Sequence, residues 1–142
     1  MLSQGLQIFR EEVSAIKSVA GLAPNSICYP LPTNAIEFMK RRGGNALGIG
    51  LDQLLFLILI STGWSNATDD TAVQTMTRNV VERTRSAARR TGVAHPYLYI
   101  NYAATGRADE VFARYGEDNL ARLRRMLTRM VSLLRMGCGE DS

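Results

Sequence analysis

Apolar side chains recur every three to four residues in three long parts of the chain, residues 6–20, 73–88 and 120–134. Charged side chains lie mostly between them, so each part has one apolar and one polar face when it is wound as a helix. The pattern therefore predicts three amphipathic helices. The stripe of the last one consists of Leu120, Leu123, Leu127, Met130 and Leu134.

Residues that favour helix ends border the second and third of these helices. Residues 66–70 (NATDD) offer capping side chains and two carboxylates before the second helix, and Gly92 follows it. From about residue 107 the chain is expected to become helical again. A break near Gly116 then precedes a cap at Asp118 or Asn119.

Three short segments have the character of strands: residues 26–31 (SICYPL), 54–60 (LLFLILI) and 96–103 (PYLYINYA). The first contains a proline and suits an edge, whereas the second is apolar throughout and is expected to be buried on both faces. A turn is expected at residues 41–45. Helices mixed with proline-broken strands predict an α+β fold, with a small, mostly antiparallel sheet of about three strands and amphipathic helices packed on it.

The third strand candidate alternates tyrosines with other residues. In a strand, Tyr102 points to the same face as Leu98 and Ile100, while Tyr99 and Asn101 point to the opposite face. This places a tyrosine on the expected inner face, where a functional role becomes possible.

The chain has 142 residues, 46% of them hydrophobic, which suits a single structural unit over residues 1–142. The formal net charge is +4, and much of it lies within residues 78–90 and 122–135. There the arginines mostly follow the polar sides of helices, without an aromatic stacking platform, so we expect no nucleic-acid partner.

Other features exclude further classes of function. The longest apolar run has seven residues, whereas a membrane helix needs about twenty, so we expect no membrane partner. No secretory signal is recognised at the N-terminus, which leaves a cytoplasmic location by default. His95 is the only histidine, and no cysteine or carboxylate cluster has ligand spacing, so no metal site is expected.

A series of short motifs follows in order along about residues 22–126. They are GGNALG at 43–48, a strand ending near Trp64, Asp69-Asp70 before a long helix, YINYA at 99–103, RYG at 114–116 with Asn119, and LARL at 120–123. The ordered series resembles the C-terminal, substrate-side part of berberine-bridge-type FAD-linked oxidoreductases, particularly fungal ones. Residues 127–142 depart from that family and form a divergent tail.

The resemblance implies an FAD cofactor, a small-molecule substrate and roles for three residues. In that family the YxNY segment passes beside the flavin ring. Carried over, Asn101 and Tyr99 contact the cofactor, and Tyr102 is the base that takes a substrate proton during hydride transfer. The pKa of a free tyrosine is about 10, so a neighbouring group must favour the phenolate. Without the resemblance, a half-buried core tyrosine is the simpler interpretation.

The same resemblance sets the expectation for activity. Family members carry an FAD domain that these 142 residues lack. We therefore expect a partial FAD-linked oxidoreductase, plausibly of fungal secondary-metabolite biosynthesis, that does not retain FAD or turn over alone and needs a flavin-domain chain. The alternative is a noncatalytic interaction module that keeps the fold, with an apolar face left for a partner.

Overall fold

The chain has an α+β fold in a computed structural model that describes residues 1–41, 44, 47–50, 54–103 and 107–137, with side chains as far as residue 132. The predicted fold class is therefore confirmed. Two compact units share the chain: unit 1 is Met1–Pro30 with Phe56–His95, and unit 2 is Leu31–Leu55 with Pro96–Ser142. A single domain over residues 1–142 with a divergent tail from residue 127 stays a prediction.

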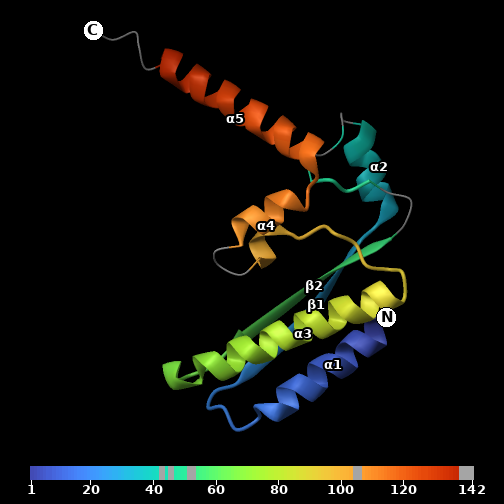
Figure 1. Cartoon of the computed structure of the whole chain (residues 1–142), viewed down its shortest axis with the longest axis vertical. Helices are drawn as coiled ribbons and strands as arrows, with labels where there is room; N and C mark the ends of the chain where they lie inside the picture. Colours follow the sequence, from blue (N-terminus) through green and yellow to red (C-terminus); the bar gives the residue numbers. More distant parts are fainter. Residues whose placement is uncertain (42–43, 45–46, 51–53, 104–106, 138–142) are drawn as a thin grey trace. The chain divides into compact units, whose positions relative to one another are not determined.

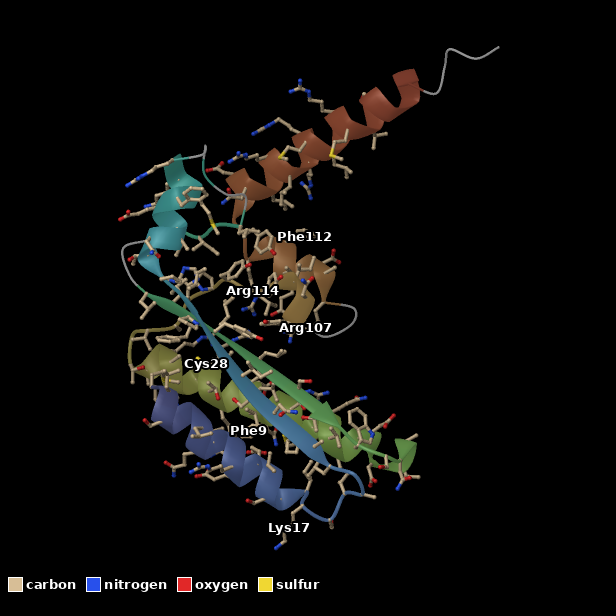
Figure 2. The ribbon with its side chains drawn as sticks, turned by 180° about the vertical axis from the view of Figure 1, so that it is seen from behind. Phe9, Lys17, Cys28, Arg107, Phe112 and Arg114 are labelled. Carbon is tan, nitrogen blue, oxygen red and sulfur yellow. The ribbon has the colours of Figure 1, made fainter. Side chains whose placement is uncertain are left out.

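Unit 1 combines two long helices with almost all of a two-stranded sheet (Figure 1). Its elements are helix α1 (Leu2–Ala15), strand β1 (Ala23–Leu31), strand β2 (Leu55–Gly63), the 3-10 helix η1 (Ala67–Asp69) and helix α3 (Asp70–Arg90). The strands pair in an antiparallel sheet. Figures 1 and 2 view the unit from opposite sides and place α1 and α3 next to each other on one face of this sheet.

The long helix α3 is fixed in unit 1 by one buried stripe. Its buried residues are Val73, Met76, Val80 and Ala87. Their spacing keeps them on one helical face, against which α1 packs with its own buried Ile8. The helix predicted over residues 73–88 is therefore confirmed. Gly92 follows it with a φ of +70°, as expected of a glycine that ends a helix.

The sheet carries exposed apolar side chains on both strands. Its exposed large side chains are Ile27, Tyr29, Phe56 and Ile58. On β2 the exposed residues alternate with the half-buried Leu57 and Leu59, as the two-residue period of a strand requires. The strand predicted over residues 54–60 is present, but its burial on both faces is wrong. The helices of unit 1, as far as the structure describes it, cover only one face.

The ends of α1 and α3 differ from prediction. The first helix covers Leu2–Ala15 rather than residues 6–20. No capping hydrogen bond from the side chain of Asn66 or Asp69 is present in the described structure. The 3-10 helix η1 occupies residues 67–69, and α3 begins directly after it. Asp70 instead accepts a hydrogen bond from Nε1 of Trp64, at 2.7 Å. This bond joins the end of the sheet to the first turn of α3.

Unit 2 contains shorter elements around a small aliphatic centre. They are helix α2 (Thr33–Arg41), the 3-10 helix η2 (Ile100–Tyr102), helix α4 (Ala108–Ala113) and helix α5 (Glu117–Gly137). Ile36, Ile49 and Leu55 form the buried cluster, with Tyr97 packed against it. Helix α2 was not predicted, and the turn expected at residues 41–45 lies largely outside the described residues.

The predicted break before the last helix is confirmed. Gly116 has a φ of +87° between α4 and α5. The predicted cap at Asp118 or Asn119 is wrong, because α5 already begins at Glu117. The Asn119 side chain reaches back and donates a hydrogen bond to the Tyr115 carbonyl, at 2.8 Å. An amide that bonds to the preceding turn holds the two helices at this corner.

Candidate functional site

The three residues that the resemblance assigns to a flavin site lie in unit 2, in a segment that is not a strand. Residues 93–99 have no regular secondary structure, and Ile100–Tyr102 is a 3-10 helix. The backbone N–H of Tyr102 donates to the Tyr99 carbonyl, at 2.9 Å. A backbone closed on itself in this way does not offer that pair of groups to a neighbouring strand. The described sheet therefore has two strands, not about three.

The 3-10 turn brings together two rings that a strand would hold on opposite faces. The ring centroids of Tyr99 and Tyr102 lie 4.8 Å apart at an interplanar angle of 73°, an edge-to-face contact. Asn101 Nδ2 donates a hydrogen bond to Tyr99 Oη, at 2.9 Å. The predicted separation of Tyr99 from Tyr102 is therefore wrong. All three residues nevertheless meet in one cluster.

This cluster presents hydrogen-bonding groups on an aromatic surface. A phenol both donates and accepts, and a side-chain amide does the same through separate atoms. Since Tyr99 Oη accepts from Asn101, its own proton remains available for a further acceptor. Tyr102 is half-buried, so only part of its surface is available to another molecule. Such a set can orient an oxygen-bearing ligand.

A second aromatic group supports the first. Tyr97 and Tyr115 stack with centroids 5.8 Å apart, and Phe112 contacts Tyr115 edge-on at 5.9 Å. Burial, followed by the proximity of Tyr115 and Tyr99, raises the pKa of Tyr97 to about 12. Burial also raises the pKa of Tyr115. Burial thus disfavours the phenolate form of both residues, and their stacked rings pack together beside the neighbouring segment.

Charged residues in and beside α4 connect to the tyrosine segment. Glu110 forms ion pairs with Arg107 and Arg114, which lower the pKa of its carboxyl group, the Arg107 hydrogen bond being the largest cause. Arg114 also donates to the Pro96 carbonyl, at 3.4 Å. Sequence reasoning assigned no role to Glu110. Its spacing of three and four residues from the two arginines was the available signal.

Gly48 lies close to the backbone of Tyr115, one of the residues of the second aromatic group. Its φ is +70°, and a Cβ atom built on it would lie 2.4 Å from the Tyr115 carbonyl oxygen. That distance is far below van der Waals contact. Only glycine therefore fits here, and the loop that contains it touches the backbone beneath the aromatic group.

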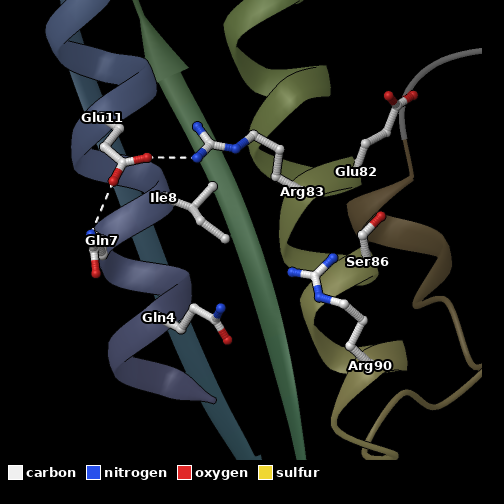
Figure 3. A pocket seen from close by; sticks show the side chains of 8 residues that line it. All are labelled: Gln4, Gln7, Ile8, Glu11, Glu82, Arg83, Ser86 and Arg90. Carbon is white, nitrogen blue, oxygen red and sulfur yellow. Dashed lines mark hydrogen bonds and ion pairs between the residues drawn. The ribbon is translucent and has the colours of Figure 1, made fainter.

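A polar groove runs between α1 and α3 in unit 1 (Figure 3). It has a volume of about 470 Å³. Arg83 crosses it and pairs with Glu11 and Glu12, with nitrogen to oxygen distances of 2.6 Å in both cases. Asn79 donates to the second oxygen of Glu12, at 3.0 Å. Gln7 also donates to Glu11, at 3.1 Å, so five polar side chains from two helices form one network.

The electrostatics of this network identify it as a clasp between helices. Hydrogen bonds lower the pKa of Glu11, chiefly from Arg83, and that of Glu12, chiefly from Asn79. The same carboxylates raise the pKa of Arg83, with Glu12 the larger cause. Carboxylates held ionised by a cation are poor general acids. We therefore assign this groove a structural role.

Neither described groove contains the tyrosine cluster. A second groove beside α1 and α3, of about 450 Å³, is lined by residues of unit 1 such as Thr75 and Met76. No three metal-ligating side chains come together among the residues whose placement is described. Burial lowers the pKa of His95, which favours its neutral form. Within the described ranges, none of the helices combines the length and apolar character needed to cross a bilayer.

Known proteins show partial similarity to this chain. It is 34% identical over 106 residues to an FAD-dependent monooxygenase of Fusarium proliferatum, and 33% identical over 105 residues to one of Cochliobolus heterostrophus. Each match covers 73% of this chain and 20% of the relative. The chain thus spans about a fifth of the length of these curated relatives. It resembles a portion of fungal FAD-dependent monooxygenases.

A relative with another name has a comparable match. An oligopeptidase of Diaporthe leptostromiformis is 31% identical over 109 residues, which are 75% of this chain and 9% of that protein. No family model matches, and no solved structure matches. The similarity therefore identifies a kind of segment found within larger fungal proteins, and leaves the berberine-bridge type to be proposed.

Proposed function

We propose that this segment forms the substrate-facing wall of a flavin site in an FAD-linked oxidoreductase of the berberine-bridge type. The observation that carries the proposal is the similarity to fungal FAD-dependent monooxygenases over 73% of the chain. The tyrosine cluster supports it, because two phenols and an amide meet on one surface. A small molecule of fungal secondary metabolism is the proposed substrate class.

Within this proposal, Tyr102 acts as a phenolate and becomes a neutral phenol when it accepts a proton from the substrate. FAD, when bound, supplies the acceptor for a hydride from carbon. Loss of a proton from a substrate O–H or N–H helps the hydride leave, so a base within hydrogen-bonding reach of that proton accelerates the step. Tyr102 shares the cluster with Tyr99 and Asn101, whereas burial raises the pKa of Tyr97 to about 12, which disfavours the phenolate of Tyr97. Tyr99 and Asn101 orient the ligand through their remaining hydrogen-bonding atoms.

The residues present fit only one side of an FAD site. The aromatic surface and polar groups of Tyr99, Asn101 and Tyr102 suit the edge of a planar ring. The printed sequence has no GxGxxG or GxxxxGK[ST] motif for the pyrophosphate. In our proposal, the pyrophosphate is held by polypeptide outside these 142 residues, in the same chain or in a separate flavin-domain chain.

A chimera tests the proposal. The matching 106 residues of the Fusarium monooxygenase are replaced with this segment, and bound flavin and turnover of that enzyme's own substrate are measured. We expect the chimera to retain flavin. Tyr102→Phe should then lower kcat by about 10²–10⁴-fold at unchanged flavin content, because it removes the proton acceptor.

Tyr97→Phe is the matched control. It removes a phenol from the neighbouring pair, which is already held neutral, so turnover should change little. The proposal fails if the chimera binds flavin and Tyr102→Phe turns over as fast as the parent chimera. If the chimera is soluble and folded but contains no flavin, the proposal that this segment forms a wall of the flavin site is wrong.

The exposed sheet face favours a second function, that of a noncatalytic interaction module. Ile27, Tyr29, Phe56 and Ile58 place apolar surface on two adjacent strands. If this face binds a partner chain, then Phe56→Ser and Ile58→Ser should weaken copurification of that partner while Tyr102→Phe has no effect. Light scattering that shows a monomer, with no partner recovered, would count against this function.

A further inference from the structure

Helix α5 carries an apolar face that no described part of the structure covers. Met126, Leu127 and Met130 are 52%, 63% and 59% exposed, and Val131 is also exposed. These residues are adjacent or one turn apart, so they form a continuous strip along the helix. Isolated apolar residues are ordinary on a surface, whereas a continuous strip marks an interaction site.

The strip is wider than the seam of a two-stranded coiled coil. Leu120, Leu123, Leu127 and Met130 have seam spacing, and of these Leu127 and Met130 belong to the exposed strip. Met126 and Val131 widen it on either side, at positions that are usually charged in coiled coils. The seam also covers fewer than the three to four heptads that indicate a coiled coil. A groove that encloses the helix on more than one side suits this surface better than a second copy of it.

The charge of α5 indicates an acidic partner. The helix contains five arginines, at positions 122, 124, 125, 129 and 135, against two carboxylates in its first turn. Arg124, Arg125 and Arg129 make no ion pair within the described part of the chain. Two copies of α5 would place like charges close together. A groove rimmed by carboxylates complements the arginines instead.

The kind of apolar residue distinguishes a protein groove from a lipid surface. Helices that lie in a membrane interface commonly carry Trp, Phe or Leu on the apolar face, whereas two of the four exposed apolar residues described in α5 are methionines and none is aromatic. Its exposed face consists of Leu, Met and Val. Basic amphipathic helices of this composition fit the methionine-lined grooves that EF-hand proteins open when they bind calcium.

We propose that α5 is a ligand helix for the acidic apolar groove of a calcium-loaded EF-hand protein. The strip of Met126, Leu127, Met130 and Val131 enters the groove, and Arg124 and Arg129, on either side of the strip, face its rim. This inference is independent of the proposed redox function, because it uses none of the tyrosine cluster.

Calmodulin is the probe for the test. Fluorescently labelled calmodulin is titrated with the purified chain in calcium and in a calcium chelator. We expect a saturable complex in calcium that dissociates in chelator. Leu127→Asp should weaken it by roughly 30-fold or more, as expected at the centre of an apolar contact. Ser132→Asp, which adds the same charge on the polar face, should weaken it by less than about threefold.

The rim contacts have a separate readout. Arg124→Gln with Arg129→Gln should weaken binding and reduce its dependence on salt, because two of the opposite-charge contacts are removed. Circular dichroism confirms that each variant keeps its helices. The inference is overturned if calmodulin does not bind in calcium, or if Leu127→Asp and Ser132→Asp have equal effects. It is also overturned if the chain self-associates through Leu127 or prefers anionic lipid vesicles to calmodulin.

Discussion

Unit 1 buries aliphatic side chains between two long helices and a sheet, whereas unit 2 surrounds a small aliphatic centre with stacked tyrosines. Aliphatic contacts have little directional preference, so the packing in unit 1 requires volume and periodicity. Aromatic rings prefer particular angles, and their hydroxyl groups need partners. The half of the molecule that holds phenols in fixed positions is therefore the half suited to orient a ligand.

The polar contacts follow the same division. In unit 1, Arg83 joins two helices that are far apart in sequence by pairing with Glu11 and Glu12. In unit 2, Glu110 of α4 pairs with arginines that flank its helix, and one of them, Arg114, also donates to the Pro96 carbonyl. The ion pairs of unit 1 thus hold its two long helices together over the core. In unit 2 the charged residues position a segment that has no regular secondary structure to hold it.

The largest expected effect concerns the core of unit 1. Met76 is 2% exposed, so Met76→Ala should lower the free energy of unfolding by about 2–5 kcal/mol through lost packing and a cavity. The single tryptophan, Trp64, lies in unit 1 and its fluorescence reports on that unit during urea unfolding. Near-ultraviolet circular dichroism of the tyrosines, four of which lie in unit 2, is recorded in parallel.

Met126→Ala is the matched control, because that methionine is 52% exposed and its loss should cost less than about 0.5 kcal/mol. If Met76→Ala moves the Trp64 transition alone, the two units unfold separately. If both signals move together, they unfold as one cooperative domain. An effect of Met76→Ala no larger than that of Met126→Ala would contradict the described core.

The next largest effect is expected where Gly48 approaches the backbone of Tyr115. Gly48→Ala and Gly92→Ala each put a Cβ on a residue with a φ of +70°, which costs roughly 1–2 kcal/mol in itself. At Gly92 nothing lies within 4 Å of the new atom, but at Gly48 it meets the Tyr115 carbonyl oxygen at 2.4 Å. We expect Gly48→Ala to destabilise by about 2 kcal/mol more than Gly92→Ala. The tyrosine dichroism measures Gly48→Ala in unit 2 and Trp64 fluorescence measures Gly92→Ala in unit 1, and equal effects would contradict the close approach of Gly48 to Tyr115.

The helices of unit 1 could be predicted because their signals are local and repeated. The stripe of α3 extends over many turns, and each residue on it supports the same periodicity. Residues 96–103 show where such reasoning fails. Their alternation resembles a strand, but a strand needs a partner, whereas the bond from Tyr102 to Tyr99 and the contact of their rings close a turn locally. An alternating sequence pattern shows which residues are apolar, but it does not show which backbone groups they hydrogen-bond to.

The sequence motif named three residues that meet in the structure, but it did not predict their geometry, and their role stays a prediction. Tyr99, Asn101 and Tyr102 were named from a motif, and the structure brings them together. The stacking of Tyr97 on Tyr115 joins residues 18 positions apart, as does the bond from Arg114 to Pro96. Contacts of this kind depend on how α4 packs, and no spacing rule within one element contains them.

The smallest expected effect is a pH dependence confined to unit 2. Tyr97 has a folded pKa of about 12, raised mainly by burial, against an unfolded value near 10. Between these values the unfolded chain releases the proton and the folded chain keeps it, so stability is fully present below pH 10 and falls as pH rises towards 12. Because the ring is partly exposed, we expect a loss of about 1 kcal/mol. Tyr97→Phe should remove that loss from the tyrosine dichroism measured between about pH 9.5 and 11.5. If stability falls equally steeply with pH in Tyr97→Phe and in the parent chain, the Tyr97 phenol has the same pKa in the folded and unfolded states. Burial in unit 2 would then have no effect on the ionisation of its tyrosines.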